Sequence, residues 1–267
     1  MDFKSLPQLL DYLKDEKTCI EYFEKIRWNG KPTCPHCEHE KVYRTNRGFK
    51  CANSKCYKKF SVKVGTIFEN SNISLRIWFA AIYLATSHKK GISSLQLGRD
   101  LNISQKTAWF VLHRIREMLR EKAPQMLKNT VQIDETYVGG KSKNKHIEKR
   151  SLKSQGRSIK DKTPVVGLLE KDGKVIAFVV KDTKASTLKS IIKDKVEKGS
   201  TIVTDAYRSY KKLDEGFKHI VVKHEDGKYV VDNQFHTQNI ENFWSLFKRG
   251  IVGIYHYISP KHLQRYC

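Results

Sequence analysis

Acidic residues stand at two positions where a strand pattern would ordinarily exclude a charge. Asp134 lies among the alternating apolar residues of 131–138, and Asp205 ends the short apolar run 201–204. An acid is a poor strand former and is costly to bury, so a surface carboxylate paired with a lysine is the less favoured interpretation. Rigidly held carboxylates are the ligands that Mg²⁺ and Mn²⁺ take. The pattern therefore favours a metal-dependent phosphoryl-transfer site.

A helical pattern over residues 236–250 carries a third acid. Its apolar residues recur at helical spacing and define a buried face. Glu241 and Lys248 are seven residues apart, which is two helical turns, so both lie on one face. A helical acid usually faces water, and a solvated Glu241 is the competing interpretation. The chain thus offers two strand acids and one helical acid, with a base two turns beyond it.

These motifs resemble those of the bacterial insertion-sequence DDE transposases that carry an N-terminal zinc ribbon and an RNase H-like catalytic domain. The likeness lies in IDETYVGGK, TDAYRSY and HTQNIENFWSLFKRG, at 133–141, 204–210 and 236–250. A CPHC…CANSKC pattern and a helix-turn-helix pattern precede them. Their combined order and spacing extend the resemblance over nearly the whole chain.

The resemblance implies a role for each acid. Asp134 would bridge two Mg²⁺ or Mn²⁺ ions, Asp205 would hold one of them, and a third ligand would hold the other. Glu241 fits the third place best, thirty-six residues after Asp205. Asn239 is the open alternative, because some members of this broad family have Asn there. Two positions apart on a helix point about 200° away from each other, so one of these two side chains faces the ions.

Basic residues near these acids are expected to contact DNA. By the resemblance, Lys248 and Arg249 would bind phosphate near the reacting end. Lys141 begins the basic run 141–162, which has no apolar periodicity and is expected to be a loop that reaches for DNA. A functionless insertion is the alternative for this run. Glu135 would face the opposite side of its strand and have a structural role.

Four of the six cysteines have the spacing of a zinc ribbon. Cys34, Cys37, Cys51 and Cys56 form a C-x2-C…C-x4-C pattern with thirteen residues between the pairs. Two such knuckles supply four thiolates for tetrahedral Zn²⁺. Two disulfides or free thiols are the alternative. A segment this small has little core, so we expect zinc to be its main source of stability.

Residues 93–115 have the pattern of a helix-turn-helix. A tight turn precedes Ser104, which is placed to cap the second helix. This helix would read base edges with Gln105 and Lys106 at its start, while Arg114 would meet phosphate. A plain helical hairpin between domains is the competing interpretation.

The composition indicates a polyanionic partner. The 267 residues include 51 Lys and Arg against 28 acids, a formal net charge of +23. A basic excess of this size favours double-stranded DNA over a merely solvated surface or a ribosome-associated role. No apolar run approaches the roughly twenty residues needed to span a membrane, and the N-terminus lacks a signal-peptide pattern. The cysteine usage suits a reducing cytosol, so we expect a cytoplasmic, nucleoid-associated protein.

The expected fold class is a multidomain α+β chain. The strands expected in the C-terminal part are 131–138, 165–169, 174–180, 201–204 and 219–222. With helices at 183–197 and 236–250, and another after Asp205, they give the RNase H-like order, a mixed sheet with helices on its faces. The expected domains are N-terminal helices at 1–30, a zinc ribbon at 31–70, a helix-turn-helix module at 71–124 and the RNase H-like domain at 125–267. Residues 60–68 are expected to be extended.

The leading hypothesis, by the resemblance, is a DNA transposase of an insertion sequence. It would bind terminal inverted repeats, cut 3′ ends and join them to target DNA, as at least a homodimer because two ends must be held together. A DNA-binding regulator on an inactive transposase fold and an RNase H-like nuclease are the alternatives. Residues 260–267 look like the start of an interrupted helix, so we expect a truncated C-terminus.

Overall fold

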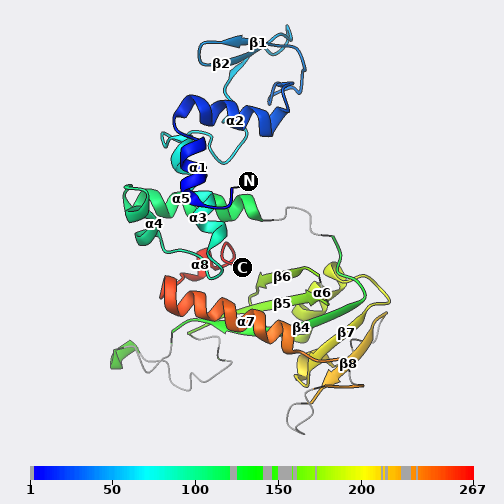
Figure 1. Ribbon diagram of the computed structural model, residues 1–267. Helices are drawn as coiled ribbons and strands as arrows, with labels where there is room; N and C mark the ends of the chain where they lie inside the picture. The colour runs from blue at the N-terminus through cyan, green and yellow to red at the C-terminus, as the bar shows by residue number, and fades with distance from the viewer. Residues whose placement is uncertain are drawn as a thin grey trace. The chain divides into compact units, whose positions relative to one another are not determined.

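The computed structural model describes residues 3–120, 125–140, 146–149, 158, 161–171, 173–211, 213, 216–223, 230–232 and 234–267. The chain divides into two compact units, Met1–Arg120 and Glu121–Cys267 (Figure 1). Each unit buries its own hydrophobic clusters.

The first unit contains a small antiparallel sheet. Its strands, in order across the sheet, are β1 (Val42–Thr45), β2 (Gly48–Cys51) and β3 (Lys59–Phe60). Gly48 has a φ of +129°, and a Cβ there would lie 2.4 Å from the carbonyl oxygen of Phe60, so the position requires glycine. The rings of Phe49 and Phe60 stack, and Trp28 meets both edge-on. These rings are most of the ribbon's core, so apolar burial alone gives it little stability.

Within residues 3–120, five helices share one capping device. They are α1 (Leu6–Tyr12), α2 (Glu16–Trp28), α3 (Leu75–Ser87), α4 (Ser94–Asp100) and α5 (Gln105–Leu119). Each is preceded by a serine or by Asp15, whose side chain accepts a hydrogen bond from a backbone N–H of the first turn. The predicted cap at Ser104 is confirmed, at 3.1 Å from the backbone nitrogen of Thr107.

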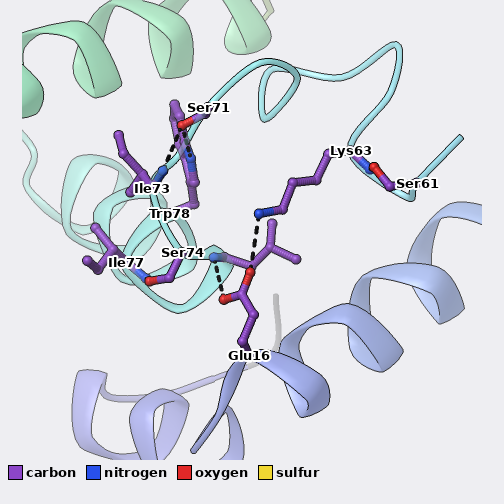
Figure 2. A network of polar contacts seen from close by, with 9 residues as sticks. Glu16, Ser61, Lys63, Ser71, Ile73, Ser74, Ile77 and Trp78 are labelled. Atoms are coloured by element: carbon purple, nitrogen blue, oxygen red, sulfur yellow. Dashed lines mark hydrogen bonds and ion pairs between the residues drawn. The ribbon is translucent and has the colours of Figure 1, made fainter. Parts of the chain in front are cut away.

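A carboxylate joins two of these helices to the chain that leaves the small sheet (Figure 2). Glu16, at the start of α2, accepts a hydrogen bond from the backbone N–H of Leu75 at 2.8 Å. The same carboxylate pairs with the ammonium of Lys63 at 3.2 Å. Leu75 is the first residue of α3, so Glu16 places a negative charge at the N-terminus of that helix, where it is favoured.

Residues 61–70 fold as successive turns. The carbonyl oxygens of Ile67 and Glu69 both accept hydrogen bonds from the guanidinium of Arg114 on α5. The expectation that 60–68 is extended is therefore wrong beyond its first residue, because these turns bond to helices rather than to a strand.

The second unit is built on a five-stranded mixed sheet. Its strands are β4 (Thr130–Val138), β5 (Thr163–Glu170), β6 (Val175–Val179), β7 (Thr201–Asp205) and β8 (Lys218–Val222). They lie in the order β6-β5-β4-β7-β8. The β4–β5 and β5–β6 pairs are antiparallel, whereas β4–β7 and β7–β8 are parallel. The predicted strands and the RNase H-like order are confirmed.

Helices cover both faces of this sheet (Figure 1). They are α6 (Ala185–Lys195), α7 (Gln238–Gly250) and α8 (Pro260–Leu263), with a π-helical turn, η5 (Ile251–Tyr255), and a 3-10 turn, η3 (Arg208–Tyr210). The second unit also has another 3-10 turn, η2 (Ile147–Lys149). Helix α6 shares a buried cluster with Ile133 of β4, and α7 shares another with Val138 of the same strand. Residues an odd number of positions apart on a strand point to opposite faces. Helices α6 and α7 therefore cover opposite faces of the sheet.

Two expectations for this unit have a different outcome. The helix expected after Asp205 is only the 3-10 turn η3. The basic run 141–162, Lys141 included, lies mostly outside the described residues. None of the helices in the described ranges is long and apolar enough to cross a membrane.

Candidate active site

The two strand acids lie on neighbouring parallel strands. In the register of β4 and β7, Gln132 is opposite Val203. Two residues further along each strand, the same face carries Asp134 on β4 and Asp205 at the end of β7. Neighbouring strands lie about 4.8 Å apart, so the register brings the two acids to neighbouring positions on one face of the sheet.

Helix α7 lies over the face that carries these acids. Gly167 of β5 is directly opposite Asp134. A Cβ at residue 167 would lie 2.5 Å from the ring of Trp244 and 3.0 Å from Ile240. The missing side chain therefore lets α7 approach the sheet beside the first acid. Glu241 follows Ile240 in the first turn of α7, so the helix brings the third acid toward the same face.

The Asp134 carboxyl is held in an unfavourable electrostatic environment. Burial raises the pKa of Asp134 to about 7, reinforced by the negative charges of Glu135, Asp205 and Glu241. A backbone hydrogen bond from Glu135 opposes this shift only in part. Two of these charges belong to the other proposed ligands, so the three acids are electrostatically coupled. A cation is the natural partner for such a group of carboxylates.

Hydrogen bonds orient the other two acids. Asp205 Oδ1 accepts from the backbone N–H of Tyr207 at 3.0 Å, in the turn that follows β7. Glu241 Oε1 accepts from the hydroxyl of the buried Thr237 at 2.7 Å. Asn239 is exposed on the same helix.

Glu135 faces the other side of β4, as expected. It is buried and accepts a hydrogen bond from the Tyr210 hydroxyl at 2.9 Å. Burial and the Glu135 charge raise the pKa of Tyr210 well above its ordinary value, so the phenol stays protonated as a donor. Nearby, Tyr137, Thr183 and Tyr207 form a chain of hydroxyl contacts at 3.0 and 3.2 Å. The sequence did not predict these hydroxyl contacts. The one feature that could have indicated them is a tyrosine two or three residues after each strand acid, Tyr207 after Asp205 and Tyr137 after Asp134.

All four ribbon cysteines come together in the first unit. Their Sγ atoms all lie within 4.8 Å of one another. The Cys34–Cys56 and Cys37–Cys51 sulfur pairs are 3.9 and 3.6 Å apart. Thiolates bound tetrahedrally to Zn²⁺ at about 2.3 Å would be about 3.8 Å apart. None of the four forms a disulfide, and the convergence of their sulfur atoms supports the expected structural zinc site.

The three acids form a more open set than the thiols. Among the residues that the structure describes, only the four cysteines have all their potential ligand atoms within 4.8 Å. That spacing suits ligands around a single ion. The outer ligands of two ions about 4 Å apart lie farther from each other than this. An all-oxygen donor set on two strands and a helix fits a pair of hard divalent cations.

Two known domain families match the chain. Residues 126–267 match the ISXO2-like transposase domain, and residues 14–59 match the transposase zinc-ribbon domain. The chain belongs to the ISXO2-like transposase family.

Relatives of this transposase-family chain support the assignment. It is 31% identical over 250 residues to an uncharacterized protein in the transposable element ISH50 of Halobacterium salinarum, a match that covers 88% of this chain and 83% of that protein. An uncharacterized transposase-like protein of Haemophilus influenzae is 33% identical over 94 residues, covering 35% of this chain and 74% of that protein.

Solved structures show only distant likeness to the chain. A chain of the simian T-cell lymphotropic virus intasome in complex with PP2A regulatory subunit B56 gamma has 12% identity and a TM-score of 0.32, covering 70% of this chain and 66% of that one. The Mos1 transposase paired-end complex has 13% identity and a TM-score of 0.21, covering 52% and 57%. Scores this low add nothing to the family assignment.

The proposed DNA contacts of this transposase-family chain lie in different surroundings. Gln105 and Lys106 are exposed at the start of α5, where the Gln105 amide donates to the Ser94 hydroxyl at 2.9 Å. Lys248 and Arg249 are exposed in the last turn of α7. These four side chains are accessible to a DNA backbone.

Arg114 is engaged within its own unit. Its guanidinium donates to the carbonyl oxygen of Glu69 at 2.7 Å and to that of Ile67, and it lies 4.8 Å from the ring centre of Phe110. Both carbonyl oxygens are bonded by the same nitrogen, Nη1, so a contact with phosphate would have to use the other guanidinium N–H groups. Lys141 is outside the described residues.

Proposed function

We propose that this chain is a DNA transposase that cleaves 3′ ends at the terminal inverted repeats of its element and joins them to target DNA. One observation carries the proposal: in the register of β4 and β7, Asp134 and Asp205 occupy neighbouring positions on one face of the sheet. Membership of a transposase family and the net charge of +23 support a DNA substrate.

Asp134, Asp205 and Glu241 would hold two Mg²⁺ or Mn²⁺ ions. Such a pair, when bound, activates a water or a 3′-hydroxyl and stabilises the leaving oxygen of an in-line displacement. The chain's own residues fix the acids in place: two strands, the Tyr207 N–H at Asp205 and the Thr237 hydroxyl at Glu241. Because ion binding requires a deprotonated Asp134, it releases a proton and becomes more favourable as the pH rises through about 7.

The third ligand in this proposal is Glu241 rather than Asn239. The Glu241 charge contributes to the raised pKa of Asp134, so its carboxyl lies within electrostatic reach of the first acid. Thr237 also holds the Glu241 side chain from one side. Asn239 is two positions earlier on the helix and points about 200° away, which places it off the site when Glu241 faces it.

The first unit is proposed to bind the inverted repeats. Helices α4 and α5 are joined by a short turn, with Gln105 and Lys106 exposed at the start of α5, as in a reading helix. Lys248, Arg249 and Lys141 are proposed phosphate contacts near the reacting end. Two element ends must be held together for transfer, so we propose a homo-oligomer of at least two chains on DNA.

The test is in vitro strand transfer with DNA that carries the element's terminal repeats. Asp134→Asn and Asp205→Asn are expected to lower transfer by at least about a hundredfold while end binding in a mobility-shift assay is kept. The matched control is Asp194→Asn, an exposed acid on α6, which is expected to leave transfer unchanged.

Three other outcomes contradict the proposal in different ways. Transfer retained by Asp134→Asn means that the site is elsewhere. Metal-dependent cleavage by the wild-type protein without joining identifies a nuclease. End binding without any cleavage identifies an inactive, transposase-derived DNA-binding protein.

A further inference from the structure

Gln132 is a buried amide on the strand that carries Asp134. Its side chain is 2% exposed, on the central strand β4. Its Oε1 accepts a hydrogen bond from the backbone N–H of Ile240 at 3.1 Å. A buried amide side chain in the middle of a sheet is unfavourable unless it is bonded, so this contact accounts for a polar residue at position 132.

The bond satisfies a helix end that has no cap of its own. Thr237 precedes α7, but its side chain makes no capping bond to the backbone. Its hydroxyl is instead donated to the carboxylate of Glu241. The first turn of a helix leaves backbone N–H groups without intrahelical partners, and Ile240 is in that turn. Gln132, 108 residues earlier in the chain, takes the place of the missing cap.

The bond also spans the proposed site. Gln132 is two residues before Asp134 and on the same face of β4. Its partner Ile240 directly precedes Glu241 on α7. One hydrogen bond therefore joins the backbone next to the third acid to the strand that carries the first.

We propose that Gln132 is a positioning residue that sets the distance between Asp134 and Glu241 by capping α7 from the sheet. The inference rests on the proposed function, since it assumes that both acids bind the same pair of metal ions. Ligand groups around Mg²⁺ or Mn²⁺ must be held to a fraction of an ångström, and residues that orient ligands commonly affect metal affinity by about ten- to a hundredfold.

The strand offers a matched set of variants. Gln132→Met keeps the length of the side chain but removes the acceptor, and Gln132→Glu restores an acceptor that a helix N-terminus favours. Thr136→Val is the control, because Thr136 is buried on the same face, two residues beyond Asp134. Its hydroxyl has no hydrogen-bond partner among the described residues.

Two readouts are measured on the full, zinc-loaded chain: the exchange rate of the Ile240 amide proton, and Mn²⁺ binding followed by electron paramagnetic resonance. Gln132→Met is expected to speed Ile240 exchange by at least about tenfold and to weaken Mn²⁺ binding by about ten- to a hundredfold. Gln132→Glu is expected to keep Ile240 protected and to bind Mn²⁺ more tightly than Gln132→Met does, and Thr136→Val is expected to change neither readout.

The inference is overturned if Gln132→Met binds Mn²⁺ like the wild type, or if Gln132→Glu binds no better than Gln132→Met. Should Gln132→Met fail to fold, Ile240 exchange in Gln132→Glu decides: protection supports the cap and its loss rejects it. Asp134→Asn separates this inference from the proposed function. If it also leaves Mn²⁺ binding unchanged, the ions bind elsewhere and the proposed function falls with it.

Discussion

The zinc ribbon and the proposed acidic site would form metal centres in opposite ways. The four thiols lie within a segment of 23 residues, and local turns bring all their sulfur atoms within 4.8 Å of one another. The acids come from β4, β7 and α7, more than a hundred residues apart from first to last. The cysteine sulfurs all lie within 4.8 Å of one another, close enough to bind a single ion, and the acids do not form such a cluster among the described residues. We therefore expect the ribbon to need its metal to fold, and the acidic site to need a folded unit before its side chains can come together.

Removing zinc should give the largest effect and should separate the two regions. The ribbon's apolar core is small, and structural zinc contributes on the order of 10 kcal/mol in isolated zinc fingers. Chelation, or Cys37→Ser, is therefore expected to unfold residues 34–60 while the second unit stays folded. Hydrogen exchange resolved by segment measures both. Cys267→Ser, a thiol outside the cluster, is the control, and a ribbon that stays protected without zinc contradicts the account.

Adding a side chain at Gly167, beneath α7, should destabilise only the second unit. A Cβ on Gly167 would lie 2.5 Å from Trp244, so Gly167→Ala is expected to push α7 from the sheet and lower the free energy of unfolding by about 3 kcal/mol. Gly140→Ala, where a Cβ would meet nothing within 4 Å, is the matched control. Thermal unfolding measures the loss, and equal stability of the two variants would show that α7 does not lie this close to β5.

The raised pKa of Asp134 should be visible in the pH dependence of the free energy of unfolding. Its pKa is about 7 in the folded protein and about 4 in an unfolded chain, so the folded state binds the extra proton between these values. Stability contributed by this proton is present below about pH 4 and is lost as the pH rises to about 7. Asp134→Asn is therefore expected to gain stability over the wild type across this window, by on the order of 2 kcal/mol after screening by water is allowed for.

The experiment is chemical denaturation of both proteins from pH 4 to 8 without divalent ions. A constant difference between them over the whole range would mean that the Asp134 carboxyl is not held among other negative charges.

A substitution on the opposite face of β4 should have the smallest effect on the free energy of unfolding. Tyr210→Phe removes the donor to Glu135 and is expected to lower the free energy of unfolding by about 1.5 kcal/mol. Mn²⁺ affinity is expected to be unchanged, because Glu135 points away from the acidic site. Weaker Mn²⁺ binding in this variant would assign Glu135 to the metal site.

Local patterns predicted much of the fold and the cysteine cluster of the zinc ribbon. The cysteine spacing alone located the zinc site, since all its ligands come from one short segment. The alternation around Asp134 and the turn signals predicted the strands and, with the resemblance, their order.

Contacts between distant segments could not be predicted from the sequence. Nothing near Gln132 indicates that it caps a helix 108 residues later, and nothing near Arg114 indicates that it bonds to the turns at 61–70. The expected extended segment at 60–68 failed for the same reason. The carbonyl groups of this segment accept hydrogen bonds from a helix, and local sequence propensities do not predict which distant helix lies beside it.

The central claim is that Asp134, Asp205 and Glu241 converge on a pair of divalent cations. A crystal structure of the full chain soaked in Mn²⁺, with anomalous diffraction to locate the ions, tests it most directly. The account predicts two peaks about 4 Å apart, with Asp134 between them, Asp205 on one and Glu241 on the other. Ions bound elsewhere, or carboxyls of residues 134 and 205 on opposite faces of the sheet, would contradict it.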